Sequence, residues 1–163
     1  MNGTEDLITR AEAIARTAHT GQVDKAGQDY IDHPRRVAAN AAAIAEEQGL
    51  DSADAESAIA AAWLHDVVED TSVSADDLRR EFPTEVVAAV DAVTKRSGEA
   101  VEDYFARVRS DRLAVIVKTA DLADNTDPVR QAALDDATRV RLAEKYRRAY
   151  ELLGVDLLEA DAD

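Results

Sequence analysis

The sequence predicts an all-α fold, and three observations support this prediction. Apolar residues recur every three or four positions, which is the period of an amphipathic helix. Only three prolines and six glycines interrupt the 163 residues. Runs in which β-branched or aromatic residues alternate with polar ones, which would indicate strands, are almost absent. We therefore expect a compact bundle of helices.

The first half of the chain divides into three predicted helices. The first covers about residues 4–20. The second begins at Pro34, whose fixed φ suits a first helical turn, and ends at Gly49. The third runs over about residues 52–69, and its middle, residues 59–64, is apolar on every side. Such a segment is typical of a central helix that other elements cover.

Helices of different lengths fill the second half. Ser74 begins a short one, and Gly154 is placed to end the last one, since glycine is favoured just past a helix C-terminus. The segment after Leu157 ends in acidic residues, and we expect it to be frayed. The predicted helices of this half cover about residues 74–82, 84–93, 98–109, 111–124 and 135–153.

The composition excludes several classes of function. With 19 basic and 34 acidic residues the net charge is −15, which argues against nucleic-acid and anionic-membrane binding. The absence of cysteine excludes disulfides and thiolate sites. No apolar run approaches about 18 residues, so we expect no transmembrane helix, no secretory signal and a cytoplasmic location. The acidity itself fits either solubility or cation binding by clustered carboxylates.

One acidic cluster follows the apolar segment of the third helix. Four polar residues, His65, Asp66, Glu69 and Asp70, lie within one and a half helical turns. His65 and Glu69 are four residues apart, as are Asp66 and Asp70, so the members of each pair share a helix face. Three carboxylates beside an apolar element repel one another, and a divalent cation would stabilise them. The alternative is a solvated acidic helix end, although acidic residues there oppose the helix dipole.

Two further positions complete a possible metal site. Asp121 follows an apolar helical stretch with Asn125 four residues later, and His33 lies at the start of the second helix. Each alone fits an exposed or capping residue. Together with His65 and Asp66, they form a nitrogen and oxygen set that suits manganese, iron or zinc. Such a metal lowers the pKa of a bound water and supplies hydroxide, while nearby carboxylates orient that water or protonate a leaving oxygen.

Four motifs occur in order around these residues. They are Ala18-His19-Thr20-Gly21-Gln22, Tyr30-Ile31-Asp32-His33-Pro34, Trp63-Leu64-His65-Asp66-Val67-Val68-Glu69-Asp70-Thr71 and Val90-Asp91-Ala92-Val93-Thr94-Lys95. Over about residues 7–127 the chain resembles HD-domain metal-dependent phosphohydrolases, in particular the hydrolase domain of RelA/SpoT-type proteins and the small alarmone hydrolases. The resemblance implies a bundle of about eight to ten helices. We expect one hydrolase domain over residues 1–156, an acidic tail over 157–163, and no synthetase or regulatory domain.

The resemblance also implies an activity. The family binds one Mn²⁺ and, as a phosphoric diester hydrolase, removes the 3′-pyrophosphate of guanosine tetra- or pentaphosphate, the alarmone of the stringent response. By analogy, Glu69 and Asp70 would position or activate the attacking water, and His19 would support its loop. The metal ligands would be His33, His65, Asp66 and Asp121, and the residues that contact the nucleotide would be Lys25, Asn125 and Tyr146.

The chain departs from the family pattern beside the nucleotide. Asp24 and Asp124 stand where the family usually has arginine and histidine. The resemblance therefore supports the type of reaction more strongly than the identity of the substrate. Another phosphorylated nucleotide, such as an adenosine alarmone, is one alternative; a non-catalytic nucleotide-binding module and a purely structural bundle are others. We expect a monomer or homodimer. The positive charge that positions 24 and 124 do not supply would then come from other side chains, namely Arg16, Arg35, Lys95, Lys118 and Lys145.

Overall fold

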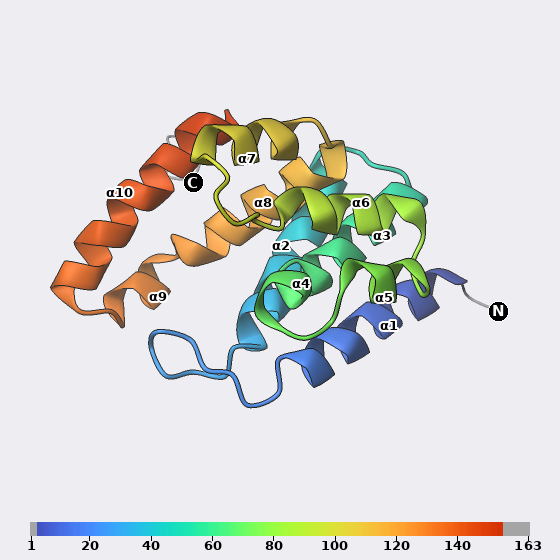
Figure 1. The fold of residues 1–163 in the computed structure, drawn as a ribbon, viewed down its shortest axis with the longest axis horizontal. Helices are drawn as coiled ribbons and strands as arrows, with labels where there is room; N and C mark the ends of the chain where they lie inside the picture. The colour runs from blue at the N-terminus through green and yellow to red at the C-terminus, as the bar shows by residue number, and fades with distance from the viewer. Residues whose placement is uncertain (1–2, 155–163) are drawn as a thin grey trace.

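The protein is predominantly helical over the described residues, as the sequence predicts. The computed structural model describes residues 3–154, whose only β-type pairing is a bridge between Val23 and Asp29. The predicted acidic tail, 157–163, lies outside the described residues. The helices are α1 (Gly3–Ala18), α2 (Asp32–Glu47), α3 (Ser52–Leu64), α4 (Val67–Asp70), α5 (Ala75–Arg79), α6 (Thr84–Val93), α7 (Val101–Arg109), α8 (Arg112–Asn125), α9 (Pro128–Ala132) and α10 (Asp136–Leu153) (Figure 1).

Helix α3 forms the centre of the molecule. It packs against α1, α2, α6 and α8, and its side chains from Ala60 to Leu64 are all buried. Alanine dominates this segment, and small side chains allow neighbouring helix axes to approach closely. The prediction of a covered central helix is therefore confirmed, apart from Ile59, which is partly exposed.

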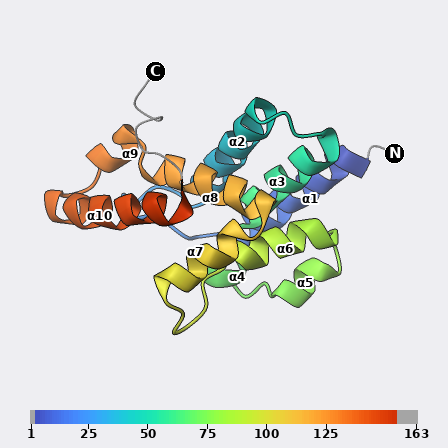
Figure 2. The ribbon, with the colours of Figure 1, turned by 90° about the horizontal axis from the view of Figure 1, so that it is seen from above.

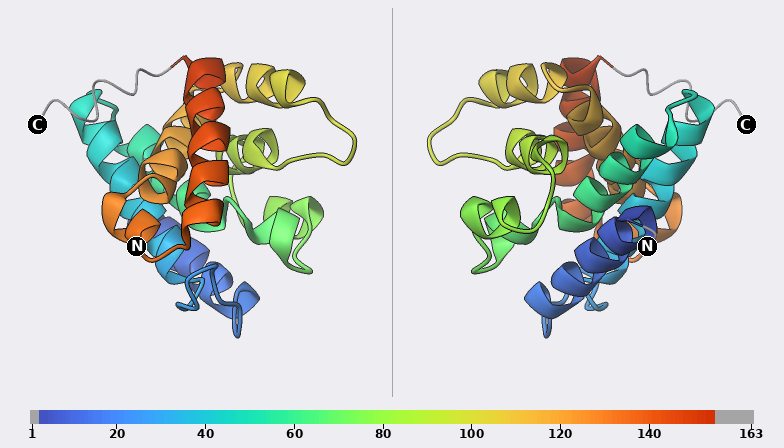
Figure 3. Two further views of the ribbon diagram at one scale, coloured as in Figure 1. Left: turned by 90° about the vertical axis from the view of Figure 1, so that its left-hand side faces the viewer. Right: turned by 90° about the vertical axis from the view of Figure 1, so that its right-hand side faces the viewer.

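The outer helices leave space beside this centre. Helices α1 and α10 lie at opposite ends of the molecule (Figures 1 and 2), and α10 packs against α7 and α8. Seen from that end, α10 crosses in front of α8 (Figure 3). A cavity of about 780 Å³ is lined by α8, by α10, by α4 and by the loop between α1 and α2. No helix in residues 3–154 has the length and apolar character needed to cross a membrane.

The helix predicted over residues 52–69 is not continuous. Helix α3 ends at Leu64, and α4 begins only at Val67. Asp66 has φ −107° and ψ 0°, in the sparsely populated region between helix and strand. The reason is a competing hydrogen bond, because the His65 ring Nδ1 and the His65 backbone N–H both contact the Ala62 carbonyl that a continued helix would offer to Asp66. The break leaves Asp66 between the two helices, at the start of α4.

The remaining predicted helices differ from the observed ones only at their ends, but one helix was not predicted. Helix α9 is five residues long; the Asp127 side chain accepts the Val129 N–H, and Pro128 occupies the first turn. Proline at this position is a recognised start signal, so the sequence did contain evidence for α9. Gly154 has φ +82° and ends α10 as predicted, in a left-handed conformation that favours glycine.

Candidate metal centre and its cavity

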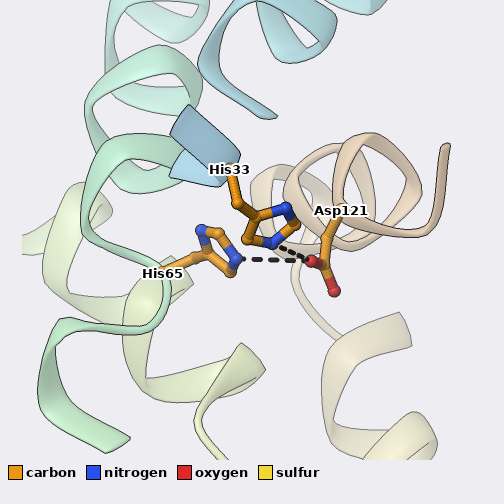
Figure 4. A group of neighbouring side chains, drawn as sticks. All are labelled: His33, His65 and Asp121. Atoms are coloured by element: carbon orange, nitrogen blue, oxygen red, sulfur yellow. Dashed lines mark hydrogen bonds and ion pairs between the residues drawn. The ribbon is translucent and has the colours of Figure 1, made fainter. Parts of the chain in front are cut away.

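Three buried side chains, from α2, the C-terminal end of α3 and α8, meet at one carboxylate oxygen (Figure 4). His33 lies in the first turn of α2, His65 follows the last residue of α3, and Asp121 lies in α8. Asp121 Oδ1 is 2.9 Å from His33 Nε2 and 3.3 Å from His65 Nε2. The three offer ligand atoms that all lie within 4.8 Å of one another. The sequence-predicted residues are thus brought together from positions up to 88 residues apart.

Asp66 adds a second carboxylate to this group. Its Oδ2 lies 3.0 Å from His65 Nε2 and 3.9 Å from His33 Nε2. The Tyr30 hydroxyl donates a hydrogen bond to Asp66 and so fixes the direction of its side chain. Asp66 therefore adjoins the group of three through the two histidines, and its carboxylate also lies close to those of Glu69 and Asp70. We define His33, His65, Asp66 and Asp121 as the ligand cluster.

One ring nitrogen of the ligand cluster has no hydrogen-bond partner among the described residues. This atom, His65 Nε2, is buried, and two carboxylates lie near it. The other ring nitrogen, Nδ1, lies 2.7 Å from the Ala62 carbonyl, which can only accept a hydrogen bond. With the proton on Nδ1, the lone pair of Nε2 points toward the carboxylates. A cation between these groups would satisfy both, so the residues present fit a divalent metal.

The electrostatics of the ligand cluster also indicate a site for a cation. Burial opposes the charge on His65, but Asp66 and Asp121 outweigh burial and raise its pKa well above the usual value. Burial likewise opposes ionisation of Asp121, yet Lys118 and the two histidines hold its pKa well below the usual range. Lys118 Nζ lies 3.1 Å from Asp121 Oδ2. Without a metal, the charged carboxylates therefore favour a proton on the ring nitrogens that would otherwise bind the cation.

Glu69 and Asp70, predicted as the catalytic pair, lie beside the ligand cluster on α4. Together with Asp66 they form a second close group of carboxylates. Glu69 Oε1 accepts the Lys95 backbone N–H at 2.9 Å, so one of its oxygens holds the loop after α6. Burial, Asp66 and Glu69 raise the pKa of Asp70. Such a carboxyl group can hold a proton closer to neutral pH than an ordinary aspartate.

The predicted nucleotide contacts all line the cavity. Lys25 reaches it from the loop between α1 and α2, Asn125 from α8 and Tyr146 from α10. Asn125 Nδ2 donates to Asp121 Oδ1 at 3.2 Å, which joins the cavity wall to the ligand cluster. His19 Nδ1 lies 2.9 Å from Gln22 Oε1 and the ring packs on Tyr30, as expected for a residue that supports the loop.

Known proteins with similar sequences identify the family. Residues 11–155 match the family described as HD domain. The chain belongs to the HD domain family. Within this family of metal-binding domains, the grouping of His33, His65 and Asp121 is compatible with a divalent ion.

Several known proteins are similar over most of this chain. A GTP pyrophosphokinase of Streptomyces coelicolor is 36% identical over 132 residues, which are 76% of this chain and 15% of the relative. A guanosine-3′,5′-bis(diphosphate) 3′-pyrophosphohydrolase of Haemophilus influenzae is 34% identical over 146 residues, 84% of this chain and 20% of the relative. The chain thus spans about a fifth or less of the length of these relatives.

A solved structure has the same fold. It is described as a metazoan ortholog of SpoT that hydrolyzes ppGpp, and the match covers 90% of this chain and 85% of that one. The TM-score is 0.63 at 22% sequence identity, so the likeness concerns the fold.

The structure changes the interpretation of the two departures from the HD pattern. Asp124 is buried, and its Oδ2 lies 2.6 Å from His33 Nδ1, so it does not face a substrate directly. Asp24 Oδ1 accepts the backbone N–H groups of Ala26 and Gln28, both at 2.9 Å, which turns this carboxylate into its own loop. Arg130 contacts both carboxylates, so neither is an uncompensated negative charge.

Sequence reasoning missed Tyr30, Arg36 and Arg130 as parts of this site. Arg130 belongs to the unpredicted α9, and Arg36 follows His33 by three residues on one face of α2, a spacing that could have revealed it. Of the expected replacement cations, Lys95, Lys118 and Lys145 line the cavity. Arg16 and Arg35 do not belong to its lining and pair with nearby acidic residues instead, so they were wrongly proposed.

Proposed function

We propose that this protein is a manganese-dependent 3′-pyrophosphohydrolase of guanosine 3′,5′-bis(diphosphate). The observation that carries the proposal is the juxtaposition of the ligand cluster with a cavity of about 780 Å³ that all four lysines of the chain line. The printed activity of the Haemophilus influenzae relative, which this chain matches over 84% of its own length, supports the choice of substrate.

The lysines support a polyphosphate as the occupant. They come from four separate segments, namely the loop before α2, the loop after α6, α8 and α10. Burial, followed by Lys95 and Lys25, lowers the pKa of Lys145, so these ammonium groups act on one another within the cavity. The cavity lining holds seven basic and six acidic side chains, so it is nearly neutral in a chain of net charge −15, and a bound divalent metal would make it attract an anion. Lysine binds phosphate as a point charge and suits flexible phosphate chains.

The ligand cluster would hold the metal. Two carboxylates and two neutral imidazoles would match the charge of a divalent ion, and Lys118 and Tyr30 would hold Asp121 and Asp66 in place. When bound, the metal would act as a Lewis acid toward the phosphate and lower the pKa of a water molecule. Manganese suits this mixed nitrogen and oxygen set, as iron and zinc also do.

The carboxylates of α4 would manage the proton in the reaction. Hydrolysis forms a bond from a water oxygen to the 3′-linked phosphorus and breaks the bond from that phosphorus to the ribose 3′-oxygen. The water gives up one proton, and the ribose oxygen takes one up. Asp70, whose pKa is raised by burial and by its acidic neighbours, would accept and return that proton. Glu69 would orient the water with the oxygen that Lys95 does not occupy.

A second candidate is hydrolysis of another phosphorylated nucleotide, such as an adenosine alarmone. Asp24 favours this candidate, because its carboxylate lies in the loop beside Lys25 and offers no cation to the nucleotide. Its neighbour Arg130 would supply the charge instead, from a different direction.

Turnover of a nucleotide panel distinguishes the two candidates. We expect manganese-dependent pyrophosphate release, abolished by a chelator, with the highest kcat/KM for guanosine 3′,5′-bis(diphosphate) over its adenosine counterpart. Equal or faster turnover of the adenosine compound would favour the second candidate. A protein that binds manganese but releases no pyrophosphate from either compound would contradict the proposed function.

A further inference from the structure

A buried carboxylate outside the ligand cluster contacts one of its histidines. Asp124 lies in α8 and is only 3% exposed. Its Oδ2 is 2.6 Å from His33 Nδ1 and 2.9 Å from Arg130 Nη1, and its Oδ1 accepts from Arg36 Nε at 2.7 Å. Both oxygens of this carboxylate therefore have donors, and none of them is a backbone group.

The contact determines which nitrogen of His33 is available. An ionised carboxylate can only accept, so Asp124 requires a proton on Nδ1. Asp121 attracts a proton to Nε2 in the same way, and a metal bound there would take the place of that second proton. The opposite nitrogen, Nε2, then directs its lone pair at the point where the ligand cluster converges, 2.9 Å from Asp121 Oδ1. A carboxylate behind a metal-ligating histidine fixes its tautomer and orientation and raises its basicity.

The two arginines keep this carboxylate charged and in place. Arg36 contacts one of its oxygens and Arg130 the other, so two positive charges favour the ionised carboxylate. Arg130 also lies 3.2 Å from Asn125 Oδ1 and 3.7 Å from Asp24 Oδ2. Since Asp24 shapes the loop that carries Lys25, Arg130 connects this loop to the support of His33.

We propose that Asp124 is a positioning residue that holds His33 with Nδ1 protonated and Nε2 directed at the metal. The inference rests on the metal site of the proposed function. It adds that affinity for the metal depends on a carboxylate that ligates nothing, and that Arg36 and Arg130 maintain this carboxylate.

The tautomer can be measured in the unaltered protein. Long-range proton–nitrogen correlation spectra of uniformly ¹⁵N-labelled protein, loaded with diamagnetic Zn²⁺, report which ring nitrogen carries the proton. We expect His33 to be protonated at Nδ1 and bound to metal through Nε2. A His33 protonated at Nε2, or bound through Nδ1, would overturn the proposal without need of any variant.

Substitution tests the strength of the effect. Asp124→Asn keeps the size of the side chain but removes its charge, and we expect it to weaken Mn²⁺ binding, measured by calorimetry, by about 10- to 100-fold. The matched control is Asp54→Asn, which removes an arginine-paired carboxylate at the far end of α3 and should leave Mn²⁺ affinity within about twofold. Thermal unfolding of the metal-free forms separates positioning from folding.

The outcomes separate this proposal from the proposed function. Unchanged Mn²⁺ affinity in Asp124→Asn, with or without a lower melting temperature, would leave Asp124 a purely structural residue and overturn the proposal. A wild-type protein that binds neither Mn²⁺ nor Zn²⁺ would overturn the metal site itself, and the proposed function with it. If the wild-type protein binds Mn²⁺ and the Asp124→Asn variant binds it more weakly, the result supports both the metal site and the positioning role of Asp124. It leaves the identity of the substrate to the turnover assay.

Discussion

Helices α3 and α8 contact each other through charged residues at both ends, and the two ends behave differently. Near their N-termini, Arg112 Nη1 lies 3.5 Å from Asp54 Oδ2, and the two side chains are 62% and 41% exposed. Near their C-termini, His65 Nε2 lies 3.3 Å from Asp121 Oδ1, and these side chains are 4% and 9% exposed. The separations are similar, so the difference lies in access to water.

The comparison shows how burial turns an ordinary ion pair into a site. At the exposed end, water screens the charges, and such a pair contributes at most about 1 kcal/mol. At the buried end, the same kind of contact shifts the pKa values of His65 and Asp121 in opposite directions and leaves a ring nitrogen without a hydrogen bond. Buried charges that are only partly compensated are costly, and a metal ion offsets that cost.

Removal of a carboxylate at each end gives the largest predicted contrast. Asp66→Ala removes one proposed ligand, so we expect it to lose bound Mn²⁺ and to reduce pyrophosphate release by about 10³-fold or more. Asp54→Ala removes the exposed partner of Arg112 and should change the free energy of unfolding by less than about 1 kcal/mol, with activity unchanged. Metal content and turnover of both variants measure the contrast; equal losses would show that burial does not distinguish the two ends.

Glu69→Gln tests a residue that acts beside the metal. The amide oxygen can keep the hydrogen bond from Lys95, but an NH₂ group replaces the carboxylate oxygen that would accept from the water. Mn²⁺ should therefore remain bound while kcat falls about 10²-fold. Calorimetry for the metal and steady-state kinetics for turnover separate the two effects. Normal turnover would remove Glu69 from the mechanism.

The pH dependence of metal binding tests the pKa shifts. His33 and His65 have raised pKa values, so both rings hold protons above pH 6.5, and metal must displace them. Mn²⁺ affinity should therefore fall about tenfold or more per pH unit as the pH drops through those values. Calorimetry between pH 6 and 8.5 measures this fall, and an affinity independent of pH would show that the rings are neutral without metal.

The raised pKa values of His33 and His65 predict that the stability of the metal-free protein changes with pH in the opposite direction to its Mn²⁺ affinity. A raised pKa in the folded state contributes stability that is fully present below the unfolded value and is lost as the pH rises through the folded value. The metal-free protein should thus become less stable toward higher pH, and the rise in melting temperature caused by Mn²⁺ should increase over that range. A Mn²⁺-induced rise that stays constant with pH would contradict this linkage.

A smaller effect is expected where the cavity meets the substrate. Lys145→Met removes one of four lysines but keeps the length of the side chain, and we expect KM for the nucleotide to rise about tenfold with kcat nearly unchanged. Arg147→Met, on the same helix but paired with Glu144 and Glu151 outside the cavity lining, is the matched control. Equal KM values in the two variants would contradict a phosphate-binding role for the lysine.

Local patterns in the sequence predicted most of the fold. Spacing of apolar residues, Pro34 and Gly154 indicated the helices, because these signals act over a few residues. The break at His65 and Asp66 was not predictable in this way, since it depends on a side chain competing for the carbonyl of Ala62. Helix α9 was missed because five residues carry too little apolar periodicity, although Asp127 and Pro128 mark its start.

The candidate site was predictable only in part. The four ligand-cluster residues stand out through their residue types and their motifs, and the structure brings them together. The contact between His33 and Asp124 joins residues 91 positions apart, and no local pattern reveals it. For the same reason the sequence suggested that Asp24 and Asp124 would repel an anion, whereas Arg130 pairs with both.

The most direct test is a titration of metal into the metal-stripped protein while pyrophosphate release from guanosine 3′,5′-bis(diphosphate) is followed. We predict no release without metal, and a rate that rises with added Mn²⁺ and saturates at one equivalent per chain. Release that persists in excess chelator, or Mn²⁺ that binds at one equivalent without any release, would contradict the assignment of the ligand cluster as the centre of this hydrolysis.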